Sequence, residues 1–316
     1  MAEDSPPLLH IGYQKTGTTW LQEYFFTVDG PVFRRADRRT VNELFVRPNP
    51  LDFDAAATRR ALEPFMAETR AAGALPVLSQ ERLSGAITLG GYDCKEIAER
   101  LAAVYPGARV LIVIRKQDGM ILSNYKQYAR TGGVMPLKRF LRPSKRVRSQ
   151  AQFDLAFFEY DRLIRAYREL FGPERVLVLT YESLREDPAG FIAAVAGFCG
   201  VPVPPMTGLG ETRNTSYSGP ILAVKRWFNH VFVNVPDNPG CLIPVGENRL
   251  VKKAFARINR LVPGFLARWA DRRMLEAIRA AAGDRYRASN ALTAKLTGLD
   301  LASWGYDLPA AEGAGS

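Results

Sequence analysis

Short apolar runs alternate along the chain with longer segments in which apolar residues recur at helical spacing. The runs are rich in Val, Leu or Ile and bounded by turn residues, a pattern that predicts buried strands. They lie at 6–12, 74–79, 109–114 and 175–180, and the helical segments that follow three of them lie at 18–26, 117–130 and 187–200. Strands alternating with helices predict a three-layer α/β fold, with a mainly parallel sheet flanked by helices. In such folds ligands bind beyond the carboxyl ends of the strands.

The sequence shows no internal repeat and no low-complexity block. Its 316 residues are compatible with one large α/β domain, and we predict a single domain over residues 1–308. The last residues, 309–316, are expected to be disordered. The segment 131–150 is strongly basic with two prolines, which fits either a surface loop or lid or a solvated connector. Residues 204–249 are rich in Pro, Gly and Asn, which predicts long loops.

A basic stretch near the C-terminus has apolar residues at helical spacing, with lysines and arginines on the other face. The apolar positions are Val251, Phe255, Ile258, Val262, Phe265, Leu266 and Trp269. Pro263 and Gly264 interrupt the pattern, so we predict two helices that pack one face onto the sheet. The alternative is a helix that lies on a membrane surface and reaches a lipid acceptor.

The chain carries a net charge of +11, which points to an anionic ligand, an acidic acceptor or nucleic acid. No zinc-finger spacing, RNP-like aromatic motif or clear helix-turn-helix occurs in the sequence. Charge alone is therefore a weak argument for nucleic acid, and an anionic small ligand or acceptor is favoured.

Cysteine usage and hydropathy indicate the compartment. Cys94, Cys199 and Cys241 lie far apart and form no CxxC pair, which argues for a reducing compartment and against a disulfide framework or a zinc site. The first residues lack the basic and apolar regions of a signal peptide, and the sequence has no run of about 18 apolar residues. We therefore expect a cytoplasmic protein without an integral membrane segment.

The stretch HIGYQKTGTTWL runs from a predicted strand through a glycine turn into a predicted helix. In this context backbone N–H groups at the helix start converge on an anion, and the helix dipole adds to the attraction. Gly12 and Gly17 have the spacing of the first half of the motif GxxxxGK(S/T), but Thr18 and Thr19 follow where Lys and Ser/Thr belong. Lys15 stands two residues before the glycine instead, so a magnesium-bound triphosphate fits poorly. The alternative is an ordinary strand-to-helix turn.

The segment QKTGTTWL resembles the 5′-phosphosulfate loop, of the form PK(S/T)GTTW, of sulfotransferases that use 3′-phosphoadenosine 5′-phosphosulfate (PAPS). Gln14 stands where proline is common. The resemblance implies a P-loop NTPase-like topology and a PAPS site in which Trp20 packs on the adenine. The ligands of the 5′-phosphosulfate that it implies are Lys15, Thr16, Gly17, Thr18 and Thr19. A tryptophan in a first helical turn is otherwise most often part of a core.

A second resemblance to the family lies in RVLIVIRKQDGMILSNYKQYA, in which Arg115 ends the strand and Ser123 follows on the predicted helix. In the family, an arginine and a serine at this separation bind the 3′-phosphate of PAPS. Arginine can direct two donors at phosphate oxygens, and the serine hydroxyl adds a third. The alternative is a surface salt bridge for Arg115 and a solvent-facing Ser123.

A third resemblance lies in RVLVLTYESLREDP, which is similar to the family's strand segment ending in YE(D/S)L. It implies that Tyr181 contacts the adenine, whereas we expect a structural role for Glu182. The FCGV segment at 198–201 and the closing GLDLASWGYDL at 298–308 also fit the general pattern of bacterial members.

The segment ETRNTSYS, at 211–218, stands where the family has a loop that closes over the cofactor. Arg213, Asn214 and Ser216 are candidates for contacts there. The segment does not match the RKG pattern of the cytosolic members, and a polar turn is the alternative.

Sulfuryl transfer resembles phosphoryl transfer in its requirements: the protein must position the reactants and stabilise the charge of the transition state. The acceptor oxygen attacks sulfur in line with the departing phosphate, and negative charge grows on the bridging oxygen as it leaves. A lysine ammonium near that oxygen stabilises this charge, and Lys15 is the candidate for the role.

A general base should take the proton of the acceptor. Cytosolic family members use histidine, but His10 is expected to be buried in the first strand and His230 has no motif around it. Several carbohydrate and protein-tyrosine sulfotransferases use glutamate, and Glu81 in LPVLSQERLSG lies just beyond a predicted strand end. We predict Glu81 as the base, with Glu23 in reserve. The alternative is a structural carboxylate paired with Arg82 or a lysine.

Together these motifs predict a cytoplasmic, bacterial-type sulfotransferase that transfers the sulfuryl group from PAPS to a hydroxyl or amine acceptor, such as a carbohydrate or glycolipid. Neither a metal nor nucleic acid is expected to take part. A P-loop nucleotide or small-molecule kinase is the first alternative, but the position of Lys15 and the pair Arg115 and Ser123 argue against it. A basic nucleic-acid-binding protein is the second, and it leaves the loop unexplained.

Overall fold

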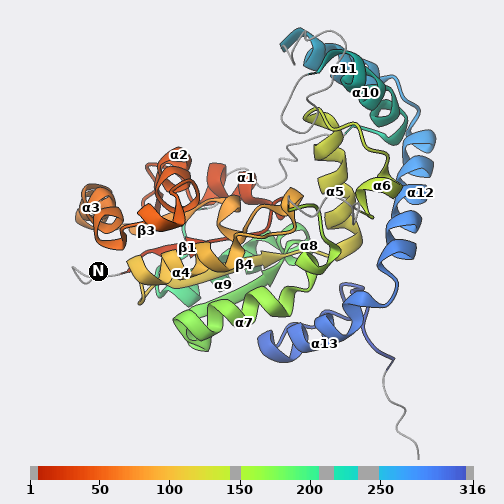
Figure 1. Cartoon of the computed structure of the whole chain (residues 1–316). Helices are drawn as coiled ribbons and strands as arrows, with labels where there is room; N and C mark the ends of the chain where they lie inside the picture. Colours follow the sequence, from red (N-terminus) through yellow and green to blue (C-terminus); the bar gives the residue numbers. More distant parts are fainter. Residues whose placement is uncertain (1–5, 143–150, 206–216, 234–248, 311–316) are drawn as a thin grey trace, which may run out of the picture. The chain divides into compact units, whose positions relative to one another are not determined.

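The computed structural model describes residues 6–142, 151–205, 217–233 and 249–310 (Figure 1). Within it the chain forms two compact units. The first, the sheet unit, comprises Met1–Lys116, Ala156–Thr212 and Asp284–Ser316, and the second, the helical unit, comprises Gln117–Leu155 and Arg213–Gly283. The single domain over 1–308 stays a prediction, and residues 311–316 of the predicted tail lie outside the described residues.

The sheet unit is built on five parallel strands in the order β2-β3-β1-β4-β5, so that the first strand of the chain lies in the middle, between β3 and β4 (Figure 1). The strands are β1 (Leu8–His10), β2 (Phe33–Arg35), β3 (Leu75–Ser79), β4 (Arg109–Ile114) and β5 (Val176–Thr180). The predicted α/β fold with a parallel sheet is thereby confirmed. All four predicted strands are present, whereas β2, only three residues long and with two arginines, was missed.

Helices bury the sheet on both faces. Leu111 and Val113 of β4 pack in one core cluster with Phe25 and with Phe191 of the helix α9 (Pro188–Cys199). Since successive side chains of a strand point to opposite faces, Ile112 points the other way, where the helix α7 (Tyr160–Phe171) contacts β4 and β5. Burial on both faces explains why β4 is a continuous apolar run instead of an alternating one.

The sheet unit's helices are α1 (Thr18–Trp20), α2 (Arg38–Val41), α3 (Ala55–Ala71), α4 (Cys94–Val104), α7 (Tyr160–Phe171), α8 (Tyr181–Glu186), α9 (Pro188–Cys199) and α13 (Arg285–Thr297). Two π-helical segments continue α1 and α2, at Leu21–Phe25 and Asn42–Val46. Short 3-10 turns occur at Pro50–Asp52, Glu81–Ser84, Ile87–Leu89, Leu155–Phe158 and Pro173–Arg175. The predicted helix at 18–26 is therefore α1 and its π-helical extension, and the one at 187–200 is α9.

The helical unit consists of α5 (Gln117–Arg130), α6 (Leu137–Phe140), α10 (Gly219–Phe232), α11 (Arg249–Arg260) and α12 (Gly264–Ala282). The predicted long loops over 204–249 are wrong for α10. Its Pro220 lies in the first helical turn, where a missing N–H costs no hydrogen bond. Residues 206–216, 234–248 and 143–150, the last within the predicted basic loop, lie outside the described residues.

The C-terminal helices have a core within the helical unit, and their predicted packing onto the sheet stays a prediction. Phe255 of α11 is buried with Tyr217, Ile221 and Leu222 in a core of the helical unit, and α12 contacts α10 and α5. Three residues of the predicted stripe, Val251, Phe255 and Val262, therefore belong to a separate small core. None of the helices in the described ranges combines the length and apolar character that a membrane crossing needs.

Asn229 connects α10 to the end of α5. Its buried side-chain amide donates to the backbone oxygens of Ala129, at 2.7 Å, and of Gly133, at 2.9 Å. Its Oδ1 accepts from Nζ of Lys225, also buried, at 2.9 Å. The last carbonyls of a helix have no partner within the helix, so Asn229 satisfies groups that would otherwise be buried without a hydrogen bond.

We expect Asn229→Ala to lower the free energy of unfolding by about 2 to 5 kcal/mol, because it leaves two carbonyls and an ammonium group with fewer partners. Chemical denaturation followed by circular dichroism measures the change. His230→Ala is the matched control, since this neighbour is exposed and should alter stability by less than about 0.5 kcal/mol. Equal effects of the two substitutions would contradict the role of Asn229.

Candidate functional site

The loop after β1 has a backbone conformation that suits an anion. Lys15 has φ 74° and Gly17 has φ 84°, both in the left-handed region, and α1 starts at Thr18. Left-handed residues between right-handed ones turn successive N–H groups toward one side, which forms a concave site for negative charge. Lys15 is the only described residue other than glycine with a positive φ. Such a conformation costs roughly 1–3 kcal/mol and is found mainly at functional sites.

Two threonines of this loop have different environments. Thr16 Oγ1 donates to the backbone oxygen of Tyr13 at 2.5 Å, which holds the turn. Thr18 Oγ1 is buried and has no hydrogen-bond partner among the described residues. A buried hydroxyl without a partner is costly, so this atom fits a site that a ligand completes. Thr19, the third predicted ligand of this type, is exposed.

Gly17 allows the loop to lie directly on α8. A Cβ atom added at Gly17 would lie 2.7 Å from Cδ2 of Leu184 and 3.5 Å from the ring of Tyr181. A larger residue is therefore excluded by contact as well as by its positive φ. The strand-to-helix turn is thus packed against the segment that follows β5, which carries the third predicted motif.

Arg115 joins the three predicted motifs of the sheet unit. It directly follows β4, and its Nη1 donates to the backbone oxygen of Lys15 at 3.0 Å. Its guanidinium carbon lies 4.6 Å from the centre of the Tyr181 ring, a cation–π geometry. The structure therefore brings together Lys15, Arg115 and Tyr181, which lie far apart in the sequence.

Glu182 has the structural role expected from the sequence. Its Oε1 accepts from the backbone N–H of Lys116 at 3.0 Å, and its Oε2 accepts from the hydroxyl of Tyr306 at 3.1 Å. Burial raises the pKa of Tyr306 well above its usual value, so this phenol stays protonated and donates. The carboxylate thus connects the end of β4 to the closing segment of the chain.

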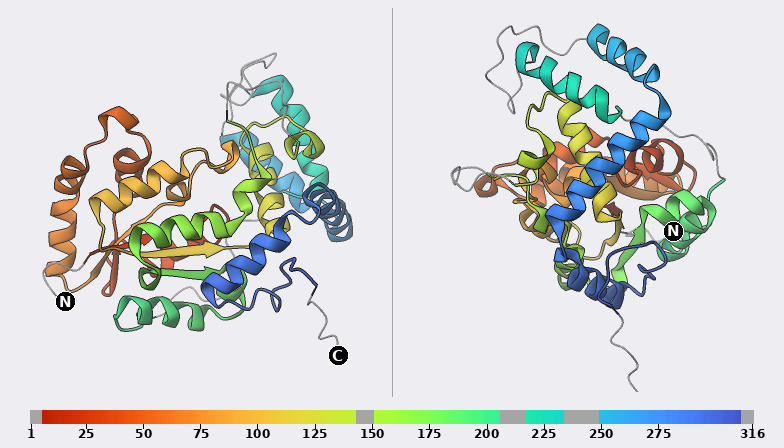
Figure 2. Two further views of the ribbon diagram at one scale, coloured as in Figure 1. Left: turned by 60° about the horizontal axis from the view of Figure 1, so that its bottom comes forward. Right: turned by 90° about the vertical axis from the view of Figure 1, so that its right-hand side faces the viewer.

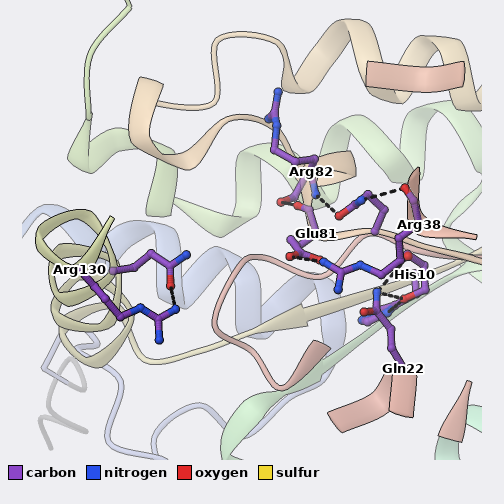
Figure 3. A network of polar contacts seen from close by, with 10 residues as sticks. His10, Gln22, Arg38, Glu81, Arg82 and Arg130 are labelled. Carbon is purple, nitrogen blue, oxygen red and sulfur yellow. Dashed lines mark hydrogen bonds and ion pairs between the residues drawn. The ribbon is translucent and has the colours of Figure 1, made fainter. Parts of the chain in front are cut away.

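Glu81 lies at the carboxyl end of β3, the neighbour of β1, as the first residue of the turn Glu81–Ser84. Its Oε1 pairs with Nη2 of Arg38 at 2.9 Å (Figure 3). Its Oε2 is buried without a hydrogen-bond partner in the described part of the chain. The predicted alternative of an Arg82 partner is wrong, because Arg82 pairs with Asp93 at 2.7 Å. The ion pair with Arg38 therefore holds one carboxylate oxygen and leaves the other for a further contact.

His10 is fully buried at the end of β1, as predicted. Its Nδ1 lies 2.8 Å from Oγ of Ser79, which also accepts from the side-chain amide of Gln22 at 3.0 Å (Figure 3). Burial lowers the pKa of His10 from 6.5 to about 3, so the ring is neutral at pH 7. A ring packed beneath the loop in this way supports its backbone. The other predicted histidine, His230, is exposed on α10 of the helical unit.

The remaining predicted residues divide by location. Trp20 lies against Tyr24, with ring centres 5.8 Å apart, and packs on the core cluster, which is the core role named as its alternative. Glu23, the reserve base, is exposed. Ser123 is half-buried on α5 of the helical unit, and its pairing with Arg115 stays a prediction. Three predicted loop residues lie outside the described residues: Arg213, Asn214 and Ser216.

Sequence analysis missed Arg38 and Gln22, which contact Glu81 and Ser79. Arg38 begins α2, a four-residue helix after β2, and no motif marks it. Gln22 lies within the segment predicted as the first helix, where a single polar residue gives no signal of its own. Gln22 could be identified only once the sheet had placed β1 beside β3, and Arg38 only once it had placed β2 beside β3.

We expect stability to depend on pH through His10. Between pH 6.5 and about 3 only the unfolded chain takes up a proton at this ring. The free energy of unfolding should therefore fall as pH falls through this range, by at most about 1.4 kcal/mol per pH unit from His10. Denaturation of wild type and His10→Gln at several pH values measures the difference in slope, which is insensitive to a constant loss of stability. Equal slopes would show that His10 takes up its proton in the folded protein.

One protein-family model matches part of the chain. Residues 95–205 match the model described as the sulfotransferase family, a segment that includes Arg115, Ser123 and Tyr181. Curated proteins gave no match to the chain.

Several solved sulfotransferases resemble the structure. One from Alicyclobacillus acidocaldarius is 19% identical, with a TM-score of 0.49 over 66% of this chain and 86% of that one. The sulfotransferase domain of a Synechococcus olefin synthase is 13% identical, with a TM-score of 0.39 over 82% of this chain and 95% of that one. A mouse sulfotransferase solved with PAP, the desulfated form of PAPS, is 14% identical, with a TM-score of 0.33 over 93% and 89%.

The family model covers the two motifs that follow β4 and β5, and the loop after β1 packs directly against both of them. The match over residues 95–205 confirms the resemblance to the sulfotransferase family that the sequence predicted.

Proposed function

We propose that this enzyme transfers the sulfuryl group of PAPS to a hydroxyl or amine group of an acceptor. The observation that carries the proposal is the loop after β1. Its backbone is left-handed at Lys15 and Gly17, and the hydroxyl of Thr18 is buried without a partner among the described residues. These features provide N–H groups and a hydroxyl for a sulfate or phosphate group. The family match over residues 95–205 is consistent with this ligand.

Each part of PAPS has proposed contacts in the chain. The 5′-phosphosulfate takes the loop ligands Lys15, Thr16, Gly17, Thr18 and Thr19. The 3′-phosphate takes Arg115, whose guanidinium already lies over the Tyr181 ring, and Ser123 keeps its proposed part in binding it. Trp20 and Tyr181 are proposed to contact the adenine. A guanidinium fixed by a ring and a carbonyl loses little conformational entropy when it binds phosphate.

Lys15 is proposed to stabilise the charge of the leaving group. PAPS supplies a sulfur atom that the acceptor oxygen attacks, with the phosphate as leaving group. The ammonium of Lys15 neutralises charge on the phosphate oxygen that departs, which is electrostatic stabilisation of a transition state. The contact from Arg115 to the Lys15 backbone keeps this residue in its left-handed conformation.

Glu81 is proposed as the general base. Its buried Oε2 has no hydrogen-bond partner in the described ranges, while Oε1 is held by Arg38. Because β3 is parallel and adjacent to β1, Glu81 and the loop leave the sheet at the same edge. An oriented carboxylate with one oxygen available can accept the acceptor's proton.

We expect PAP to stabilise the protein against heat much more than Mg-ATP or AMP does. At about 100 times its Kd a ligand adds roughly 2.7 kcal/mol to the free energy of unfolding. Thermal-shift titrations with PAP, Mg-ATP and AMP give the affinity for each ligand. The kinase alternative takes over if Mg-ATP stabilises the protein and PAP does not.

The same titration with Arg115→Ala tests the proposed 3′-phosphate contact. This substitution also removes the hydrogen bond to Lys15, so the informative quantity is the ratio of affinities for PAP and AMP, which differ by the 3′-phosphate. We expect the ratio to fall toward one in Arg115→Ala. It should be unchanged in Arg109→Ala, at the opposite end of β4. An unchanged ratio in Arg115→Ala would exclude the contact.

We expect Glu81→Gln to lower kcat by about 10²–10⁴, with little change in the KM for PAPS, because a general base acts on the acceptor. Release of PAP with the best acceptor from a panel of sugars, phenols and amines measures the rate. Glu23→Gln, the same change one turn beyond the loop at an exposed site, is the control. If Glu23→Gln lowers kcat and Glu81→Gln does not, the two glutamates exchange roles.

A further inference from the structure

Half of the apolar stripe near the C-terminus faces solvent. Phe255 is buried in the core of the helical unit, and Val262 packs beside it. By contrast, relative exposure reaches 50% for Ile258, 81% for Leu261 and 64% for Phe265. Leu266 and Trp269 are exposed as well. We call these five exposed residues, Ile258, Leu261, Phe265, Leu266 and Trp269, the α11–α12 corner.

The five residues of the α11–α12 corner lie close together along the chain, from the last turn of α11 to the first turns of α12. The N–H of Leu261 donates to the oxygen of Ile258 at 3.0 Å, in the turn that ends α11. Phe265 and Trp269 are four residues apart on α12 and so lie on the same side of that helix. Exposed apolar residues that occur singly need no explanation, but a group of five in adjacent turns marks an interaction surface.

Cationic residues surround the corner. The exposed ones on α11 and α12 are Lys253, Arg257, Arg260, Arg268, Arg272, Arg273 and Arg279. The guanidinium of Arg273 lies 5.2 Å from the centre of the Trp269 ring. Between residues 249 and 275 the sequence has one acidic residue, Asp271, and its carboxylate pairs with Lys126 of α5 at 2.8 Å. The next acidic residue, Glu276, is exposed on α12 about one turn beyond Arg272 and Arg273. The surface around the corner is therefore predominantly positive.

This combination selects one class of partner. Aromatic and aliphatic side chains beside arginines are typical of helices that lie in the surface of a bilayer, where rings sit at the headgroup level and guanidinium groups contact anionic headgroups. A nucleic acid would satisfy the arginines and could stack on Trp269, but it offers nothing to Ile258 and Leu261. An acidic protein surface would likewise leave the aliphatic residues poorly matched.

We propose that the α11–α12 corner binds the surface of an anionic lipid bilayer, with Phe265 and Trp269 inserted at the boundary between headgroups and acyl chains. The arginines and lysine of α11 and α12 contact the anionic headgroups. The proposal does not depend on the sulfuryl donor or on the acceptor, because the residues involved lie in the helical unit and none has a role in the proposed reaction. Figure 2 shows α11 and α12 as the consecutive light-blue and blue helices.

Co-sedimentation of the full-length protein with lipid vesicles tests the proposal. We expect binding to vesicles that contain about equal parts of phosphatidylglycerol and phosphatidylcholine, and at least about tenfold weaker binding to phosphatidylcholine alone. Binding should weaken as salt rises, since the headgroup contacts are screened. Tryptophan emission should shift to shorter wavelength on binding, and Trp269→Phe should remove most of that shift while it preserves binding.

Two variants separate the apolar and charged contributions. Phe265→Ser with Trp269→Ser should weaken vesicle binding by about tenfold or more, and so should Arg268→Gln with Arg272→Gln. The matched controls lie on the sheet unit. Leu51→Ser alters a leucine that is 94% exposed, and Arg47→Gln with Arg60→Gln alters two exposed arginines. Neither control should change binding, and circular dichroism checks that every variant is folded.

Three outcomes would overturn the proposal. The first is equal binding to neutral and anionic vesicles, or none to either. The second is binding of a single-stranded oligonucleotide that Arg268→Gln with Arg272→Gln abolishes and the Phe265 and Trp269 variant does not change, which would assign the surface to nucleic acid. The third is a dimer in solution that the Phe265 and Trp269 variant converts to a monomer without vesicle binding in either form, which would assign it to a second copy of the chain.

Discussion

The parallel pairing of β1 with β3 on one side and β4 on the other is the constraint on which the candidate site depends. His10, the last residue of β1, is in register with Ser79 of β3 and with Leu111 of β4. Because the three strands run in the same direction, the chain leaves all of them at one edge of the sheet. The loop after β1 therefore lies between Glu81 and Arg115 as a consequence of strand order, although about 100 residues separate Lys15 from Arg115 along the chain.

The loop itself is held in a costly conformation by contacts from its neighbours. Lys15 adopts a left-handed φ that residues other than glycine avoid, and Arg115 donates to its carbonyl. Thr16 fixes the turn through Tyr13, and Gly17 lies against Leu184. A loop whose backbone is fixed by its own packing contacts loses little conformational freedom when it binds a ligand, so more of the binding energy is available for discrimination between anions. The strain at Lys15 is offset by packing at the ends of β4 and β5.

The parts of this arrangement that sequence analysis could predict are those with a local signal. Strands buried on both faces are continuous apolar runs, so β1, β3, β4 and β5 were identified, and the loop was recognised from the spacing of Gly12, Lys15 and Gly17. The short β2 contains two arginines, and α10 begins within a segment rich in Pro and Gly, so the first was missed and the second was predicted as a loop. The partner of Glu81 could not be predicted, because Arg38 reaches it only through the pairing of β2 with β3.

The net charge of +11 also has a more specific explanation than an anionic ligand in general. The cationic side chains described at the loop are Lys15 and Arg115. The charge of Arg38 is neutralised by its ion pair with Glu81. Seven exposed cations lie instead on α11 and α12, next to apolar side chains that face solvent. Positive charge that served only solubility would be dispersed over the surface. It would not explain why the aromatic rings of Phe265 and Trp269 are exposed beside the cations. The two proposals therefore assign the charge of the chain to two different anions, a small one at the edge of the sheet and an extended one at the helical unit.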